Sequence, residues 1–319
     1  MKKKSKIKII ILIMLLLLTT GCTKTLTDKD NKAVKNEVTQ QTLTKNIICQ
    51  PTDKVSIKAY EKNGVDLEKL PKCEDFKITS GKYEGLWTSF LVKPLAFILL
   101  TIGQILGFTG KYALSIIIVS LAIRLIAYPV TRKTALQSEL IKKAQPELNR
   151  IQKKYQGKED QESMIKQNQE TLMVYKKYNI NPLSSCLLAF IQLPLFFAFL
   201  EAINRVPAIF KGNFLGMNLG MTPSTGIANQ NYIYIILIVL IIGTTYLSFR
   251  NSSAQQNSGN PEMEQQMKMM TVFMIFTISL ASFSLPTAIA LYWIVTNGFA
   301  VIQNVIIKKI IEKYFKWNE

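Results

Sequence analysis

The chain has 319 residues, a mean hydropathy of +0.16 and 48% apolar residues, which gather in long runs. Its formal net charge is +18, from 39 Lys and Arg against 21 Asp and Glu. The apolar runs favour a polytopic membrane protein over a soluble globule, and a basic excess in such a protein is typical of cytoplasmic loops more often than of nucleic-acid binding. The absence of histidine, and four cysteines without a C-x-x-C pair, disfavour a zinc site, a histidine-based triad and a redox motif.

Residues 1–21 are predicted to be a signal peptide. Five lysines precede ten apolar residues, and small residues follow up to Cys22. A glycine directly before that cysteine resembles a bacterial lipoprotein signal, so we expect Cys22 to be acylated, as by palmitate. Thr19 stands where such a signal usually has leucine. Ordinary cleavage and an uncleaved anchor are the alternatives, and each of them places the following segment outside the membrane.

Residues 22–84 are polar, rich in lysine and poor in aromatic residues. This composition suits an extracytoplasmic tail, either a tether or a small subdomain. Cys49 and Cys73 would lie in an oxidising compartment and could form a disulfide, but two free thiols fit the sequence almost as well.

Residues 85–110 are apolar but interrupted by Lys93 and Pro94. We interpret them as an amphipathic helix on the outer membrane surface, with Trp87 and Lys93 at the level of the lipid headgroups. A membrane-spanning helix is the alternative.

Five further apolar segments have the length of membrane spans, about 1.5 Å of rise per residue across a hydrocarbon core of about 30 Å. They are 112–130, 183–203, 231–249, 269–285 and 287–307. The loop 131–180 carries eleven Lys and Arg, whereas 204–230 carries two, so the first is predicted to be cytoplasmic and the second external. The expected fold is an all-α core of five transmembrane helices over 111–307, with a basic cytoplasmic tail at 308–319.

The cytoplasmic loop 131–180 is too regular for a linker. Apolar residues recur at helical spacing from Leu140 to Tyr155 and predict an amphipathic helix. A turn at 156–160 and a second helix, with Met164, Leu172 and Tyr175 on its apolar face, would complete a helical hairpin.

Arg124 lies inside the first predicted span, about six residues or 9 Å from its cytoplasmic end. An arginine near the middle of a span costs roughly 2.5–3.5 kcal/mol on the most lenient scale, so it needs water or a partner. Ser120 and Tyr128 share its helix face, and we expect a hydrophilic groove open to the cytoplasm. An arginine that snorkels to the headgroups is the alternative.

Three segments resemble the YidC/Oxa1/Alb3 family of membrane protein insertases: "SIIIVSLAIRLIAYPVTRKTALQSELIKKAQPELNRIQKKY", "NPLSSCLLAFIQLPLFFAFLEAI" and "LPTAIALYWIVTNGFAVIQNVIIKK". A lipoprotein-like signal without a large folded external domain resembles the Gram-positive bacterial members of this family. The resemblance covers 85–319 and implies a groove that opens to the cytoplasm and to lipid, with Arg124 as the charge that attracts substrate segments. It further implies that Gln192, Tyr292 and Trp293 line the groove or contact substrates. The tail 22–84 is longer than a Gram-positive member would have.

The predicted function follows from this resemblance and the groove. The protein would move short polar flanks of nascent membrane proteins through the groove and release their apolar segments into the bilayer of the bacterial cell membrane. The resemblance implies the ribosome and the Sec translocon as partners, and we expect a monomer without cofactor, metal or enzymatic activity. A transporter or channel with an anion-binding arginine and a lipid-anchored binding protein are the alternatives, but no inverted repeat or mid-membrane carboxylate supports the transporter.

Overall fold

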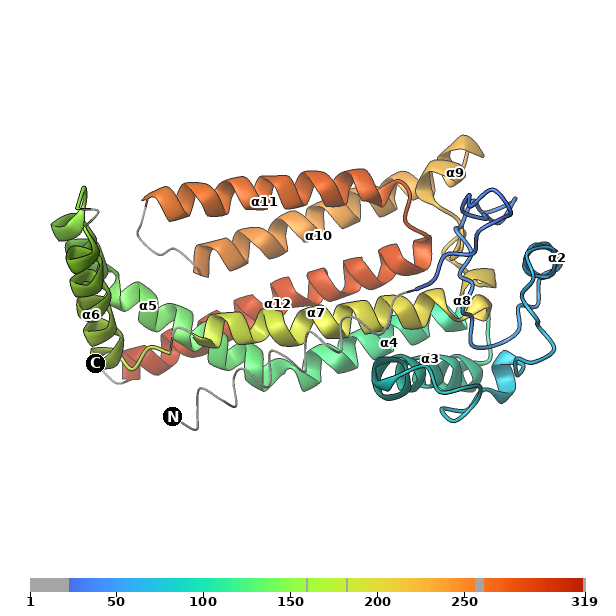
Figure 1. The fold of residues 1–319 in the computed structure, drawn as a ribbon, viewed down its shortest axis with the longest axis horizontal. Coiled ribbons are helices and arrows are strands. Elements are labelled where there is room, and N and C mark those ends of the chain that lie inside the picture. Colours follow the sequence, from blue (N-terminus) through green and yellow to red (C-terminus); the bar gives the residue numbers. More distant parts are fainter. Residues whose placement is uncertain (1–22, 159, 182, 256–260, 318–319) are drawn as a thin grey trace. The chain divides into compact units, whose positions relative to one another are not determined.

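The computed structural model describes residues 23–158, 160–181, 183–255 and 261–317; within them, the side chains of 183–193, 251–255 and several positions after 261 are not described. The described part is mostly helical (Figure 1). Its helices and strands are α2 (Lys54–Lys62), η1 (Cys73–Asp75), η2 (Thr88–Val92), α3 (Lys93–Leu106), α4 (Lys111–Ile126), α5 (Tyr128–Tyr155), α6 (Gln161–Lys177), α7 (Leu183–Asn204), α8 (Pro207–Lys211), β1 (Asn213–Phe214), β2 (Met217–Asn218), α9 (Pro223–Ala228), α10 (Ile233–Gln255), α11 (Pro261–Ser282) and α12 (Thr287–Trp317).

The chain forms two compact units, and five long helices pass from one to the other. The first unit comprises 1–120, 192–239 and 281–293, and the second comprises 121–191, 240–280 and 294–319. α4, α10 and α12 therefore run from the first unit into the second, whereas α7 and α11 run from the second into the first. The helix α3 lies wholly in the first unit.

Several described helices are long and apolar enough to cross a membrane. By length and composition, these candidates are Thr88–Leu106, Ile233–Arg250 and Thr287–Ile311, with a fourth if α4 and α5 form one bent span. Shorter apolar stretches occur within α7 and α11, at Pro194–Asn204 and Thr271–Ser282. These helices confirm an all-α membrane protein at the level of fold class.

The first predicted span does not continue straight to residue 130. α4 ends at Ile126, and α5 begins at Tyr128 after a bend of 53°. Pro129 lies in the first turn of α5, where its fixed backbone angle and missing N–H fit a helix start but not the interior of a continuous helix.

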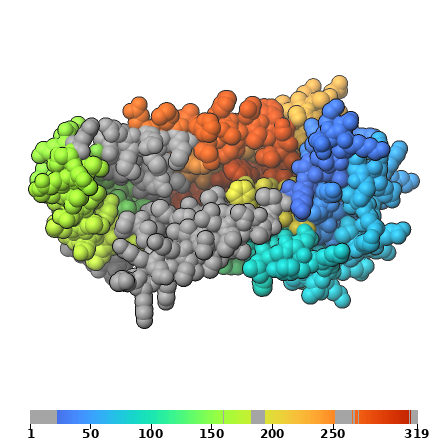
Figure 2. All heavy atoms as spheres, in the orientation of Figure 1, coloured from blue at the N-terminus to red at the C-terminus, as the bar shows by residue number. Residues whose placement is uncertain are grey.

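The polar tail is folded over its described residues, 23–84. Isolated β-bridges join Thr25 to Thr44 and Lys35 to Thr42, and α2 follows them. A small core is formed by four buried residues with partly buried apolar neighbours around them: Leu26, Leu43, Ile47 and Tyr60. Figure 2 shows the tail as a compact group of atoms beside the segment that contains α9, and the Thr222 amide donates to the Thr39 carbonyl there at 3.3 Å. The tail thus has a small apolar core of its own.

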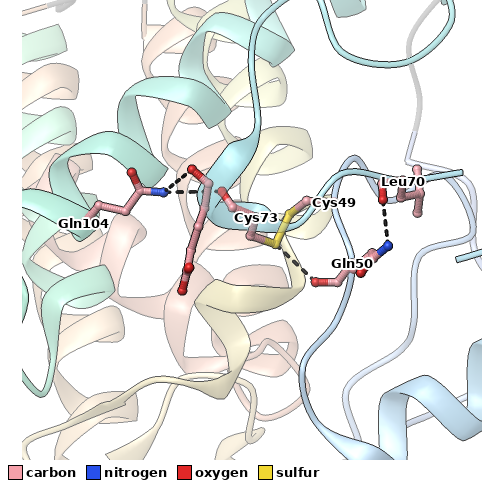
Figure 3. The surroundings of a disulfide bond; sticks show 6 residues. Cys49, Gln50, Leu70, Cys73 and Gln104 are labelled. Carbon is pink, nitrogen blue, oxygen red and sulfur yellow. Dashed lines mark hydrogen bonds between the residues drawn. A yellow bond between two sulfur atoms is a disulfide. The ribbon is translucent and has the colours of Figure 1, made fainter. Parts of the chain in front are cut away.

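A disulfide joins Cys49 to Cys73 and holds the second half of the tail (Figure 3). Both cysteines are buried, and the Gln50 side chain donates to the Leu70 carbonyl at 2.8 Å within the same loop. On the other side, the Gln104 amide of α3 donates to the Glu74 carbonyl at 3.0 Å. The disulfide loop is therefore fixed to the C-terminal end of α3.

Trp87 and Lys93 do not face lipid headgroups as predicted. Trp87 is 1% exposed and Lys93 is 4% exposed. The Lys93 ammonium donates to the carbonyls of Ser80 (2.6 Å) and Lys82 (3.3 Å) in the tail. The apolar body of each side chain packs in protein, and the polar end of each finds a protein partner, which is the arrangement a buried polar group requires.

The predicted cytoplasmic hairpin is present as α5 and α6, which lie side by side in the second unit (Figure 1). Its interface contains Ala144, Val174 and Ile180, with Leu140, Ile141, Leu148, Ile151, Tyr175 and Tyr178 packed around them. The apolar face predicted for α6 is wrong in part, because Met164 and Leu172 are 53% and 54% exposed.

The end of the chain and the predicted external loop also differ from expectation in detail. Residues 308–317 continue α12 as helix and do not form a separate tail. In the loop 205–230, β1 and β2 form a two-residue hairpin at Leu215 and Gly216, which both have positive φ as a type I′ turn requires. Residues 283–286 form the turn that joins α11 to α12.

Candidate functional site

Arg124 lies in the last turn of α4, where the negative end of the helix dipole favours a cation. Its side chain is partly exposed, although its Nε atom is buried. The adjacent Leu125 and Ile126 are 60% and 78% exposed, as expected of apolar residues that face lipid. α4 thus ends with one charged side chain next to an apolar surface.

The polar side chains predicted to form a stripe with Arg124 are taken up by contacts within the protein. The Ser120 hydroxyl is buried and donates to the Ile116 carbonyl at 2.6 Å, so its bond stays within the helix. Tyr128, one turn beyond Arg124, packs against a cluster of Ala135, Ile307 and Ile311. Tyr128 therefore belongs to the packing between α5 and α12, beyond the bend that separates it from Arg124.

Tyr292 and Trp293 belong to an aromatic cluster that joins α12 to α7. The Tyr292 ring stacks on Phe199, with ring centres 4.3 Å apart and planes 20° apart, and Trp293 meets Phe196 edge-on at 5.4 Å. Tyr292 is 3% exposed, whereas Trp293 is partly exposed. Aromatic pairs of this geometry add about 0.5–1.5 kcal/mol beyond their area burial. The Tyr292 ring is thus positioned for packing, and Trp293 retains an exposed surface.

The predicted site residues are divided between the two compact units. Tyr292 and Trp293 belong to the first unit with Phe196 and Phe199, whereas Arg124 belongs to the second. The predictions for the Gln192 side chain and for Cys22 fall outside the described residues. Phe196 and Phe199 were missed by the sequence reasoning, although their spacing of three within an apolar helix is a signal for one packed face.

A second polar cluster, which the sequence analysis did not predict, lies at the end of α7. Arg205 is fully buried, and both Nη2 contacts to the Glu84 carboxylate measure 2.7 Å. Its Nη1 donates to Glu201 at 3.2 Å, and its Nε donates to the Asn46 carbonyl at 2.6 Å. The Trp87 indole also donates to Glu201, at 2.8 Å. The Glu201 carboxylate therefore accepts hydrogen bonds from both Arg205 and Trp87.

This cluster ties the tail to the helices. Glu84 and Asn46 come from the tail, Glu201 comes from the last turn of α7, and Arg205 directly follows that helix. The Arg205 carbonyl also accepts from the Ile48 amide at 3.0 Å. A buried arginine is tolerated because two carboxylates and a backbone carbonyl surround it.

Among the described residues, no group of three or more Cys, Asp or Glu side chains could hold a metal ion. The chemistry available here is charge, hydrogen bonding and apolar surface.

Apolar helices that pass repeatedly between two units, with an arginine at the end of one of them, define a multi-pass helical membrane protein. A family profile described as "60Kd inner membrane protein" matches residues 104–314. The membrane protein insertase YidC of Oceanobacillus iheyensis is 34% identical over 71% of this chain and 85% of its own. YidC of Alkalihalophilus pseudofirmus is 36% identical over 69% and 81%, and the insertase MisCA of Bacillus subtilis is 32% identical over 70% and 79%.

The chain belongs to the YidC family of bacterial membrane proteins, in its Gram-positive, Bacillus-like form. The resemblance inferred from the sequence motifs is thereby confirmed.

Proposed function

We propose that this protein is a membrane protein insertase that acts without covalent catalysis. It would move short polar flanks of substrate proteins through a hydrophilic groove and release their apolar segments into the bilayer. The observation that carries this proposal is the family match across 104–314, which includes Arg124 at the end of an apolar helix.

Five transmembrane helices are the topology that we propose for the core. The passage of α4, α7, α10, α11 and α12 between the two units in alternating directions supports it. The eleven basic residues of 131–180 orient the bundle with the hairpin and the C-terminus in the cytoplasm. The tail and the loop 205–230 would then be extracytoplasmic.

We further propose that α3 lies along the outer surface although its composition would allow it to span. Its two ends, Lys93 and Gln104, are about 16 Å apart along the helix axis and both bond to the polar stretch 73–82 of the tail. If α3 crossed the membrane, that stretch would have to follow it into hydrocarbon, where backbone polar groups have no partners. An interfacial helix avoids this cost.

The mechanism assigns separate tasks to the charge and to the apolar surface. Arg124 would attract an acidic or polar flank into the groove, where water lowers the desolvation cost of the flank. The adjoining apolar segment would leave toward lipid and gain about 25 cal/mol for each Å² of apolar area removed from water. This gain would drive insertion without ATP.

The remaining elements receive roles that rest on family resemblance. The α5–α6 hairpin would recruit substrates and the ribosome, and the Sec translocon would cooperate with the bundle. The exposed apolar side chains of α6, such as Met164 and Leu172, support a contact surface on the hairpin. Acylation at Cys22 would anchor the start of the tail at the outer surface.

Proteoliposomes that contain only this protein would test the proposal. The substrate is a newly made single-span protein with an acidic external flank, and protection of that flank from added protease reports insertion. We expect wild type and Arg124→Lys to insert it and Arg124→Ala to lose about tenfold, which corresponds to about 1.4 kcal/mol. Arg150→Ala, which changes an exposed arginine of the hairpin, is the matched control.

Two other outcomes of this assay would change the proposal. Equal insertion by Arg124→Ala would remove charge attraction from the mechanism while keeping the insertase. No insertion by folded wild type, together with flux of an anionic solute, would favour a transporter.

A further inference from the structure

A cavity of about 660 Å³ lies between the disulfide loop of the tail, the turn from α3 to α4 and the end of α8. All the residues that line it belong to the first unit. The disulfide between Cys49 and Cys73 closes the loop on one side, and the bond from Gln104 to the Glu74 carbonyl joins it to α3 on the other (Figure 3). The loop that forms one wall of the cavity is therefore held in place by covalent and hydrogen bonds.

The lining of this cavity is basic. Each of the three segments contributes one lysine: Lys72, Lys111 and Lys211. Glu74 is the one carboxylate among the described residues of the lining, which leaves three positive charges against one negative. None of these four side chains takes part in an ion pair with a described residue, and none of the three ammonium groups donates a hydrogen bond to one. The Lys111 ammonium instead lies 5.3 Å from the centre of the Tyr112 ring.

This charge distribution fits an anion. Like charges that converge on one cavity repel each other, and an anion between them replaces that repulsion with attraction. A cleft lined by one sign of charge also raises the local concentration of the opposite ion. Lysine binds phosphate as a point charge with three donors, without the planar geometry that arginine imposes. A phosphate group therefore suits three lysines that come from separate segments.

The surface beside the cavity is apolar and exposed. Phe108 lines the cavity and is 50% exposed, and Ile105, in the last turn of α3, is 78% exposed. With α3 on the outer membrane surface, as proposed above, these two side chains lie beside lipid. A phospholipid joins a phosphate to acyl chains, so it matches both the lysines and the apolar side chains. A zwitterionic headgroup would add its own cation beside the lysines, and the net positive charge therefore favours an anionic lipid.

We propose that this cavity binds the phosphate headgroup of an anionic phospholipid from the outer leaflet, with its acyl chains against Ile105 and Phe108. The bound lipid would connect the tail, through Lys72, to the start of the first core helix, through Lys111. This inference goes beyond the insertase function and depends only on the outer placement of α3. Soluble phosphate shares the chemistry of the headgroup and is a separate arm of the test.

Photo-cross-linking in vesicles would test the proposal at the site itself. The protein is reconstituted into phosphatidylcholine vesicles that contain a small fraction of a photoreactive lipid, either phosphatidylglycerol or phosphatidylcholine, with the reactive group close to the glycerol. Mass spectrometry of the digested protein then measures how much lipid is attached to residues 105–113. The readout is the ratio of labelling by the anionic lipid to labelling by the zwitterionic lipid, because labelling by bulk lipid affects both equally.

We expect the anionic lipid to label this segment at least about fivefold more than the zwitterionic one, since a single lysine near an anionic headgroup has an effect of about that size. The variant with Lys72→Gln, Lys111→Gln and Lys211→Gln should have a ratio of about one. Lys72→Gln and Lys211→Gln alone, both at exposed positions, should each give an intermediate ratio, which keeps the test valid if the triple variant does not fold.

The matched control changes three exposed lysines of the same tail that do not line the cavity: Lys24, Lys29 and Lys32. Their replacement by glutamine removes the same charge and should leave the wild-type ratio. Addition of inorganic phosphate, against chloride at equal ionic strength, should also leave the ratio unchanged if the ligand is a lipid.

Four outcomes would overturn the inference. Equal labelling by both lipids in the wild type would show that the cavity does not select an anionic headgroup. A wild-type ratio in the folded triple variant would show that these lysines do not form the site. Loss of the preference in the control variant would assign it to the overall charge of the tail. Loss on addition of phosphate but not of chloride would assign the cavity to soluble phosphate. None of these results depends on insertase activity, which the proteoliposome assay with Arg124→Ala tests separately.

Discussion

Arg205 shows how a single buried charge can hold distant segments together. It lies in the loop after α7 and contacts Glu84 of the tail, 121 positions earlier in the chain. Its neighbour in the cluster, Glu201, is 3% exposed and accepts from both Arg205 and Trp87. Each member of the cluster provides a hydrogen-bond partner for another, so the removal of one leaves a polar group without its partner.

Replacing Arg205 by alanine should destabilise the protein strongly. The substitution leaves Glu201 buried without its cation, and breaking one partner of a buried ion pair costs about 3–5 kcal/mol. The expected result is a lower free energy of unfolding in detergent micelles and faster protease cleavage of the tail. Arg150→Ala, at an exposed position of the hairpin, should change neither quantity. Unchanged cleavage of the tail in Arg205→Ala would show that the cluster does not hold it.

Only half of this cluster has a signal in the sequence. The four-residue spacing of Glu201 and Arg205 at the end of an apolar helix fits an ion pair between them. Glu84 and Asn46 could not be connected to them, because no local pattern encodes a contact across more than a hundred residues. The location of Trp87 was predicted wrongly for the same reason, since a tryptophan side chain fits a membrane interface as well as a buried site.

Among the elements, the hairpin α5–α6 shows where periodicity succeeds and where it fails. α5 was predicted correctly because its apolar residues occupy one face and its other faces are charged. On α6, apolar residues occur on two faces, so pattern alone could not tell buried Val174 from exposed Met164 and Leu172. Two ion pairs join the helices further: Glu147 with Lys177, and Glu170 with Lys154.

Acid should loosen this hairpin. Hydrogen bonds from Lys177 and Tyr178 hold the pKa of Glu147 below its ordinary value, and Lys154 and Tyr155 do the same for Glu170. Since these pKa values are lowered by folding, their contribution to stability is complete above the ordinary carboxyl pKa. It is lost as the pH falls from that value through the lowered ones. The effect should be small, because the carboxylates are solvated.

The distance between spin labels at positions 153 and 168, one on each helix, would measure this loosening. We expect a single short distance at pH 7 and a broader distribution at pH 3. A variant with Glu147→Gln and Glu170→Gln should show the broader distribution at both pH values. An identical narrow distribution for both proteins at both pH values would show that apolar packing alone holds the hairpin.

At the scale of the whole molecule, the family could be predicted from the sequence. Whether α3 spans the membrane or lies on its surface could not. The apolar stretch 88–106 satisfies the criteria of length and composition for a span. Its placement depends on bonds to the tail, which no hydropathy pattern contains. The fold of the tail was hard to predict because its apolar core is small. The disulfide adds stability to this small core. Closing a loop across 24 positions stabilises by about 3 kcal/mol on the chain-entropy model.

The two positions of α3 make opposite predictions for chemical labelling. Single cysteines would be placed at Lys82 and Thr109, which lie before and after the helix, in a chain whose Cys186 is replaced and whose disulfide is intact. If α3 lies on the outer surface, a membrane-impermeant thiol reagent added outside intact cells should label both. If α3 spans the membrane, it should label only one. A cysteine at Gly157, in the turn between α5 and α6, should be labelled only after the membrane is opened, because the basic hairpin is expected in the cytoplasm.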